Sequence, residues 1–203
     1  LKASFRECRA LTRALGIPEA ASRRYEADDL LALAARRGRP RPVVLMSTDK
    51  DLLQLLQPGD WRWTPGAPAP ESYAQLRESL GFPPEAMATY LALTGDASDG
   101  IPGVPGIGAK TAARLCARFA DLPALYEALE AQGSEALGPV AGAAGIARKL
   151  LHGREAAYHA FTLTTLSRAV PRRFDPAARA LPPLTEARLE KALRAGGLVG
   201  YAL

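Results

Sequence analysis

The sequence contains little cysteine and little histidine. It has two residues of each kind, and Cys8 and Cys116 lie inside helical patterns with no second cysteine nearby. Both a disulfide-stapled scaffold and a cysteine-based zinc site need cysteines at closer spacing, so the sequence excludes them. We therefore expect reduced cysteines, which are typical of cytoplasmic proteins.

Long apolar runs and a secretory signal pattern are also missing. No stretch reaches the roughly 18 apolar residues of a membrane-spanning helix. Hydrophobic residues make up 48% of the 203 residues and charged residues 23%, a composition typical of a globular protein with a core. We predict a cytoplasmic monomer with no membrane partner.

Acidic residues are outnumbered and clustered. The chain has 26 Lys and Arg against 21 Asp and Glu, for a net charge of +5. Part of the acidic charge falls into three short clusters, so the remaining chain is more basic than the net charge suggests. The clustered acids are Glu26, Asp28, Asp29, Asp49, Asp51, Asp96 and Asp99. This distribution suits a protein that attracts a polyanion and holds a cation against it, although charge alone is equally compatible with a solvated basic surface.

Helical and strand patterns alternate up to residue 70. The expected elements are helices ending at Ala14, at 27–37 and at 51–56, a buried strand at 42–47 and an edge strand at 61–64. Strands that alternate with helices indicate a parallel α/β sheet, so we predict such a domain over residues 1–70.

Helical patterns dominate residues 71–203, where we predict a second domain. The expected helices are 72–80, 84–93, 110–119, 122–131, 141–166 and 185–195. A stretch rich in glycine and proline, 95–108, is the only long non-periodic segment among them.

The three acidic clusters favour a hard divalent cation. Each has a simpler explanation: acids at 26–29 and 49–51 can cap helices, and those at 96–99 can form an Asx turn. Three acids within four positions nevertheless exceed what capping needs, and the second cluster directly follows a predicted strand, where α/β sheets place ligands. Because carboxylates without histidine or cysteine favour Mg²⁺ or Mn²⁺ over zinc, the pattern indicates phosphoryl-transfer chemistry.

The glycine-rich segment offers a phosphate site. Gly103, Gly106 and Gly108 allow a tight turn, and Lys110 and Thr111 open the helix that follows. Backbone N–H groups at such a helix start can face a phosphate. The spacing does not fit a Walker motif, and a plain tight turn is the alternative.

Three motifs together resemble the 5′–3′ exonuclease and flap endonuclease family, most closely the 5′ nuclease domain of bacterial DNA polymerase I. They are YEADD at 25–29, STDKDLLQLL at 47–56 and GDASDGIPGVPGIGAKTA at 95–112, and the resemblance extends over about residues 1 to 165. It implies an α/β fold with a PIN-like parallel sheet, truncated at the N-terminus. A helical subdomain would follow, with a helix–3-turn–helix that binds duplex DNA at about 90–120.

The resemblance also implies roles for individual residues. Asp28, Asp29, Asp49 and Asp51 match catalytic acids, which would hold two Mg²⁺ or Mn²⁺ ions together with Glu26, Asp96 and Asp99. The implied DNA-binding residues are Gly103, Val104, Gly106, Ile107, Gly108, Lys110 and Thr111. Carbonyl groups of Val104 and Ile107 would hold a K⁺ ion that bridges to a DNA phosphate.

The implied activity is structure-specific hydrolysis of DNA near single-strand/duplex junctions, by a metal-activated water. A polymerase domain, in the same or another chain, is a possible partner. The sequence departs from the family in three places: it lacks a first strand ending in a metal-binding Asp, it lacks the helical arch, and it has Gly100 where the family has Asn. We therefore expect little activity from this chain alone. A catalytically silent DNA-binding module is the main alternative, and a PIN-like phosphatase or ribonuclease is a third, which would not need the turn motif.

Overall fold

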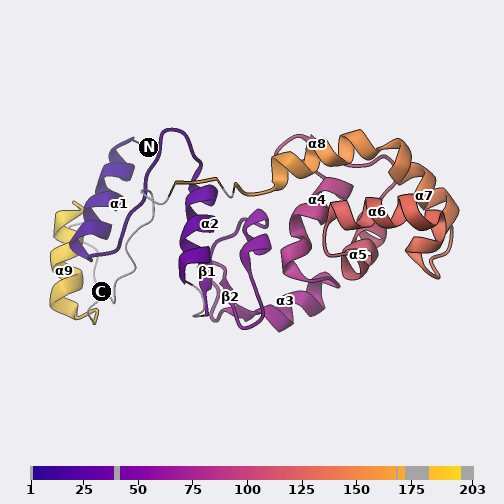
Figure 1. Cartoon of the computed structure of the whole chain (residues 1–203). Coiled ribbons are helices and arrows are strands. Elements are labelled where there is room, and N and C mark those ends of the chain that lie inside the picture. The colour runs from indigo at the N-terminus through magenta and orange to yellow at the C-terminus, as the bar shows by residue number, and fades with distance from the viewer. Residues whose placement is uncertain (1, 39–41, 168, 172–182, 198–203) are drawn as a thin grey trace. The chain divides into compact units, whose positions relative to one another are not determined.

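The computed structural model describes residues 2–38, 42–167, 169–171 and 183–197, and the following statements concern these residues (Figure 1). The chain forms two compact units, one from Leu1–Ala34 with Ala169–Leu203 and one from Ala35–Arg168. This grouping is based on contacts between residues in space. The domain boundary expected at residue 70 is based instead on a change of sequence pattern, and it stays a prediction.

The first unit is built on helices from both ends of the chain. Helix α1 (Lys2–Ala14) packs against α9 (Glu186–Ala195). The Arg188 guanidinium of α9 donates a hydrogen bond to the Leu15 carbonyl oxygen just after α1. Helix α2 (Ala27–Gly38) begins in this unit, where Leu30 and Leu33 form a small apolar cluster with Val170.

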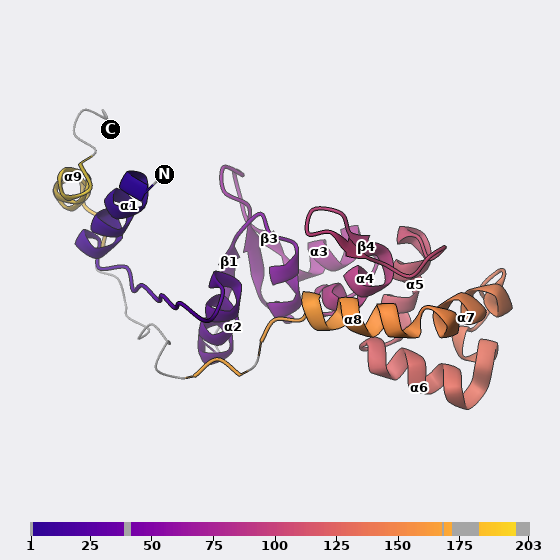
Figure 2. The same cartoon turned by 90° about the horizontal axis from the view of Figure 1, so that it is seen from above.

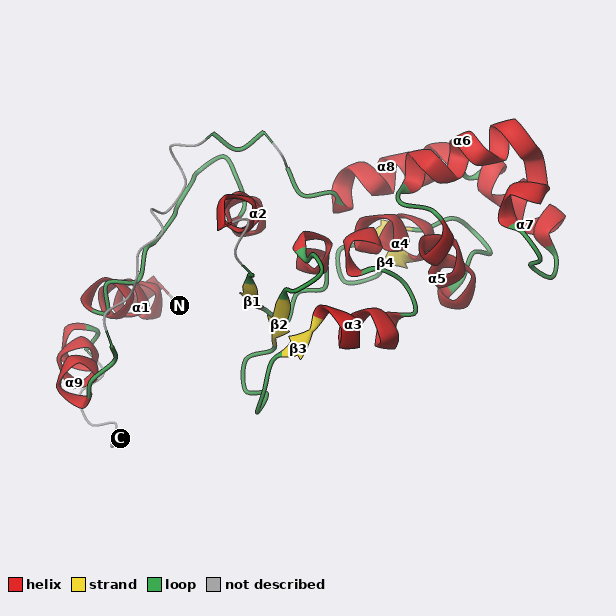
Figure 3. Cartoon of the chain, turned by 60° about the horizontal axis from the view of Figure 1, so that its bottom comes forward, coloured by secondary structure: helices red, strands yellow, loops and turns green. Residues whose placement is uncertain are grey.

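The second unit contains a three-stranded sheet in the order β1-β2-β3 (Figure 3). Strands β1 (Val44–Met46) and β2 (Trp61–Trp63) are parallel, as the sequence predicts, and β3 (Glu71–Ser72) runs antiparallel to β2. The expectation that β2 lies at an edge is wrong. The two residues of β3 extend the sheet beyond it, and an ion pair between Arg62 and Glu71 joins the two strands.

The expectation that β1 is a buried strand is also wrong. Leu45 is 5% exposed, but Val44 and Met46 are 56% and 58% exposed. Side chains alternate between the faces of a sheet, so Val44 and Met46 share one face with their register partners Trp61 and Trp63, which are 39% and 36% exposed. An apolar run predicts a strand but does not tell which of its faces is covered.

Helices form most of the second unit. In chain order they and the short strands between them are the 3₁₀ helix η1 (Asp51–Leu55), α3 (Tyr73–Leu80), η2 (Pro84–Ala86), α4 (Met87–Thr94), β4 (Gly95–Asp96), β5 (Ile101–Pro102), α5 (Ala109–Arg118), α6 (Leu122–Gln132), η3 (Gly133–Leu137), α7 (Ala143–His152) and α8 (Arg154–Thr164). Helix α4 is apolar on nearly all sides and packs against α5 and α8 (Figure 2), so it forms the centre of the core.

The helix expected at 141–166 is two helices. They meet at Gly153, where a Cβ atom would lie 2.7 Å from Cγ1 of Val104. A side chain does not fit there without a shift, and the chain turns from α7 into α8 at this contact with the glycine-rich turn. Among the described helices, none combines the length and the apolar character that crossing a bilayer would require.

Candidate metal centre and DNA-binding turn

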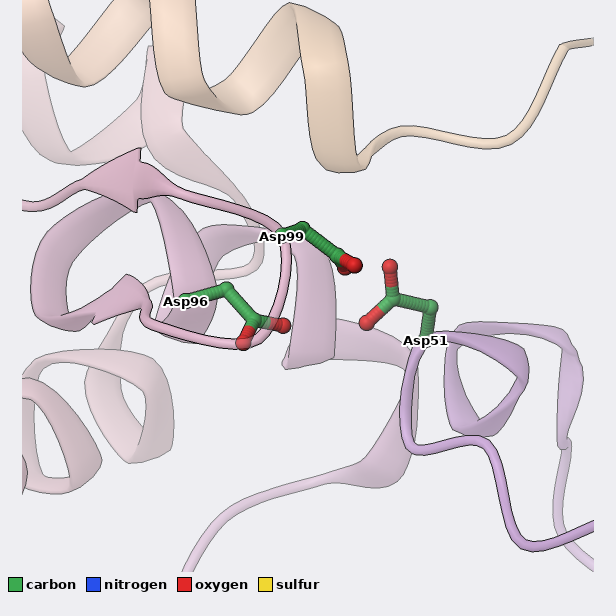
Figure 4. A group of neighbouring side chains, drawn as sticks. All are labelled: Asp51, Asp96 and Asp99. Atoms are coloured by element: carbon green, nitrogen blue, oxygen red, sulfur yellow. The ribbon is translucent and has the colours of Figure 1, made fainter.

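Three aspartates from two distant segments meet at one end of the sheet. Asp51, Asp96 and Asp99 each offer a carboxylate oxygen within 4.8 Å of the other two (Figure 4). Asp51 begins η1, directly after the loop that follows β1, whereas Asp96 ends β4 and Asp99 lies in the hairpin loop between β4 and β5. The fold therefore joins the second and third acidic clusters of the sequence.

Local hydrogen bonds fix the segment that carries Asp51. The Asp49 backbone N–H donates to the Ser47 hydroxyl oxygen, and the Asp51 N–H donates to Asp49 Oδ1 at 2.9 Å. The Gln54 side-chain amide donates to the carbonyl oxygens of Asp51 and Thr164, at 2.8 and 2.9 Å. These bonds tie η1 to the end of α8 and hold Asp51 in place.

The β4–β5 hairpin holds Asp96 in a buried position. Asp96 is 2% exposed, and its Oδ1 accepts hydrogen bonds from the Ser98 N–H at 3.0 Å and the Ser98 hydroxyl at 2.5 Å. The base of the hairpin needs glycine, because a Cβ on Gly95 would lie 2.5 Å from the Gly103 nitrogen. The glycine-rich turn and the acidic hairpin are thus one tightly packed piece of backbone.

Lys50 adds a cation to this group. Its Nζ lies 2.8 Å from Asp96 Oδ2 and forms an ion pair with it. Burial alone would raise the pKa of Asp96, but the contacts with Lys50 and Ser98 hold it below its ordinary value. The same contact with Asp96 raises the pKa of Lys50.

Asp51 has the opposite perturbation. Burial raises its pKa to about 6, and the nearby carboxylates of Asp49, Asp96 and Asp99 add to this effect. Oδ1 of Asp51 is buried and has no hydrogen-bond partner, whereas the buried Oδ2 of Asp96 has the Lys50 ammonium beside it. Buried carboxylate oxygens without donors need a cation, and an all-oxygen set suits a hard divalent ion. The residues of this site therefore fit the metal that the resemblance implies.

The structure does not bring every predicted acid into this group. Asp49 is exposed and lies outside it, with one oxygen taken by the Asp51 N–H. Glu26, Asp28 and Asp29 belong to the first compact unit, where the two aspartates lie in the first turn of α2. Their joining the metal site stays a prediction.

The glycine-rich turn is docked on the end of α4. The Val104 N–H donates to the Leu93 carbonyl oxygen at 2.9 Å, and the Ile107 N–H donates to the Val104 carbonyl oxygen at 3.0 Å. The side chains of both turn residues are buried, at 3% and 4% exposure. Helix α5 then begins without a side-chain cap at Gly108, and the Lys110 side chain is exposed. The turn thus presents backbone N–H groups and a cation to solvent.

Sequence reasoning missed Lys149. This exposed residue of α7 donates a hydrogen bond from Nζ to the Gly106 carbonyl oxygen at 3.2 Å, so a second lysine lies at the turn. No local signal could have identified it, because Lys149 is separated from Gly106 by 43 residues and looks like any basic residue in the last turn of a helix.

Comparison with known proteins gives matches over both parts of the chain. Residues 82–187 match the family model described as 5′–3′ exonuclease, C-terminal SAM fold, and residues 1–71 match that described as 5′–3′ exonuclease, N-terminal resolvase-like domain. The chain is 39% identical over 121 residues to a DNA polymerase I of Rhizobium leguminosarum, covering 59% of this chain and 12% of that protein. It is 34% identical over 148 residues to the flap endonuclease Xni of Shewanella woodyi, covering 72% of this chain and 55% of that protein.

Solved structures show the same fold. A mutant of the T5 5′-exonuclease superposes with a TM-score of 0.52 at 24% identity, over 71% of this chain and 57% of that one. T5 5′-exonuclease with bound divalent zinc ions gives a TM-score of 0.51 at 24% identity, over 71% of this chain and 51% of that one. The chain spans about half the length of the flap endonuclease and T5 proteins it matches.

Proposed function

The chain belongs to the 5′–3′ exonuclease family, and on this basis we propose that it acts in structure-specific hydrolysis of DNA phosphodiesters near single-strand/duplex junctions. The observation that carries the proposal is the convergence of Asp51, Asp96 and Asp99, with a buried oxygen of Asp51 that has no hydrogen-bond partner. A protein that only binds DNA gains nothing from carboxylates concentrated beside a polyanion.

Asp51, Asp96 and Asp99 would hold a divalent ion, Mg²⁺ or Mn²⁺. Asp49, with Glu26, Asp28 and Asp29, would complete a site for two ions. When bound, such ions supply a water of lowered pKa as the nucleophile and stabilise the leaving oxygen. The chain itself holds these residues in place, through the Ser98 hydrogen bonds to the Asp96 carboxylate and the Gln54 hydrogen bond to the Asp51 backbone carbonyl.

The glycine-rich turn would grip the duplex away from the cut. Backbone N–H groups at the start of α5, with Lys110 and Thr111, would bind a phosphate, because no side chain caps this end of the helix. The Val104 carbonyl accepts only the Ile107 N–H among the described residues, and a carbonyl oxygen has two lone pairs. It can therefore still help Ile107 to hold a K⁺ ion. Such contacts fix the register of the duplex without reading its sequence.

The isolated chain should bind better than it cuts. Its 203 residues contain neither the strand ending in Asp nor the arch that the resemblance assigns to cleavage. We place the protein in the cytoplasm at the nucleoid as a monomer. Because relatives of the chain include DNA polymerase I, a polymerase domain is the partner we propose.

A labelled 5′-flap duplex tests the proposal with the chain as it stands. Binding is measured by fluorescence anisotropy in EDTA, and cleavage is measured in Mg²⁺ and then Mn²⁺. We expect salt-sensitive binding with little or no cleavage, and no cleavage at all by an Asp51→Asn/Asp96→Asn control. Failure to bind the duplex would refute the assignment of the turn. Cleavage that survives in the control would refute the metal site.

A further inference from the structure

Lys50 lies where a divalent cation would have to make its contacts. It stands between two of the predicted acids, Asp49 and Asp51, immediately before η1, and its ammonium group crosses to the hairpin and reaches Asp96 Oδ2 at 2.8 Å. That oxygen is buried, and Lys50 is the cation that the described residues place beside it.

The charge of Lys50 acts on the whole aspartate group. The pKa of Lys50 is raised first by the contact with Asp96, and also by the charges of Asp51 and Asp99. The ammonium therefore lies within the field of all the carboxylates that can share a metal ion. Since the Asp96 side chain is 1% exposed, its charge needs a partner in place, and Lys50 is the partner that the structure shows.

The ammonium and a divalent ion exclude each other at this oxygen. Two cations that share one carboxylate oxygen lie only a few ångströms apart and repel strongly. The Lys50 side chain is 46% exposed and flexible, so its ammonium can leave into water at small cost. The carboxylate of Asp96 has no such freedom, because Ser98 holds its other oxygen.

We propose that Lys50 competes with the metal ion: its ammonium group pairs with Asp96 until a divalent ion binds and displaces it. This inference rests on the metal site of the proposed function. The ion pair keeps Asp96 paired and oriented before the metal arrives. It also lowers the affinity for the metal by the strength of the ion pair that must be broken.

The first experiment measures the affinity for Mn²⁺ by calorimetric titration of the wild-type chain and of Lys50→Met, which keeps the length of the stem. We expect Lys50→Met to bind about two- to fivefold more tightly, the range of one partly exposed ion pair. Lys191→Met, which changes an exposed lysine of α9 outside the aspartate group, is the matched control and should bind like the wild type. Equal or weaker binding by Lys50→Met would overturn the proposal.

The second experiment needs no variant, so a folding defect cannot obscure it. The wild-type chain is acetylated briefly with an amine-reactive ester, with and without Mn²⁺, and each lysine is followed by peptide mass spectrometry. Acetylation of Lys50 should rise severalfold with Mn²⁺, while the exposed Lys110 and Lys191 should not change. Unchanged acetylation of Lys50 in the presence of bound metal would overturn the proposal.

The outcomes separate this inference from the proposed function. If the wild-type chain binds no Mn²⁺ at millimolar concentration, the metal site itself fails and the inference fails with it. If the wild type binds Mn²⁺ and loses binding in Asp96→Asn, the metal site stands. The response of Lys50 then decides the inference alone.

Discussion

The ionised form of Asp51 destabilises the folded chain, and measuring stability as a function of pH can show this effect. Its pKa in the folded chain is about 6, against an ordinary value of 3.8, because burial and neighbouring carboxylates oppose its charge. Between these values the folded state holds a proton that the unfolded state releases, so this group's contribution to stability falls as pH rises from about 4 to about 6. In EDTA, Asp51→Asn should melt at a higher temperature than the wild type at pH 7.5, and the difference should shrink below pH 6.

Glu127→Gln provides the control for this titration. Glu127 is exposed on α6, away from the aspartate group, and its change should shift the melting temperature by a similar small amount at every pH. A difference between Asp51→Asn and the wild type that stays constant from pH 5 to 7.5 would contradict the perturbed pKa of Asp51.

Asp60 is a buried acid that no sequence cluster marked. It is 1% exposed, and its two oxygens accept the backbone N–H groups of Val43 at 2.9 Å and Gln57 at 2.8 Å, joining the approach to β1 with the turn before β2. Removing it leaves two backbone N–H donors without their partner. Asp60→Ala should therefore lower the free energy of unfolding by on the order of 3 kcal/mol in urea denaturation. A loss no larger than that of Glu127→Ala would refute this structural role.

At the scale of single residues, the sequence predicted that acids of separate clusters lie together better than it predicted their surroundings. Asp51, Asp96 and Asp99 were all expected in the metal site, and they do lie together. Their different burial, and the ion pair of Lys50 with Asp96, depend on how a hairpin packs against a loop some 46 residues away, and no local pattern encodes that packing.

The glycine-rich turn depends on glycine, because a residue with a Cβ atom does not fit at Gly103. A Cβ on Gly103 would lie 2.3 Å from the Thr94 carbonyl carbon and 2.6 Å from the Leu93 carbonyl oxygen, whereas a Cβ on Gly108 would meet nothing within 4 Å. Gly103→Ala should therefore cost more than about 2 kcal/mol of unfolding free energy, and Gly108→Ala should stay within about 0.5 kcal/mol of the wild type.

Chemical denaturation of the two variants checks this contrast, with duplex binding as the second measurement. Gly103→Ala should also lose binding, because the turn can no longer dock on α4. Equal stability of the two variants would contradict the close backbone approach between Gly103 and the end of α4.

The sequence predicted helices well where capping residues or glycines mark their ends. The helices α5, α6 and α9 fall within a residue or so of their expected positions, since the Asp121 and Thr185 side chains cap α6 and α9 and glycines end both helices. Strands β3, β4 and β5 have two residues each, too few to show a period. The break at Gly153 follows from a contact with Val104, which lies outside any sequence window.

At the scale of the whole molecule, the sequence predicted the family but not the grouping of the chain in space. Three motifs identified the family because their residues and order are specific. The packing of α1 against α9 joins segments from opposite ends of the chain, and an exposed apolar face forms on β1 and β2 where a buried strand was expected. Periodicity describes one element at a time, so it carries no information on either feature.

Because the chain carries a net positive charge, duplex binding is a property of the whole chain. We expect each lysine that contacts a phosphate to contribute equally to the salt dependence of the affinity. Each phosphate contact releases about one counterion, so Lys110→Ala and Lys149→Ala should each lower the slope of log affinity against log salt by roughly one unit, and together by roughly two. Both losses should be the same for duplexes of different sequence, because phosphates carry no base information.

Lys191→Ala, which changes an exposed lysine of α9, is the matched control and should leave the slope unchanged. Anisotropy titrations on two unrelated duplexes from 50 to about 200 mM salt measure these slopes. An unchanged slope for Lys149→Ala would remove α7 from the DNA-binding surface, and an unchanged slope for both variants would place the duplex elsewhere than on the glycine-rich turn.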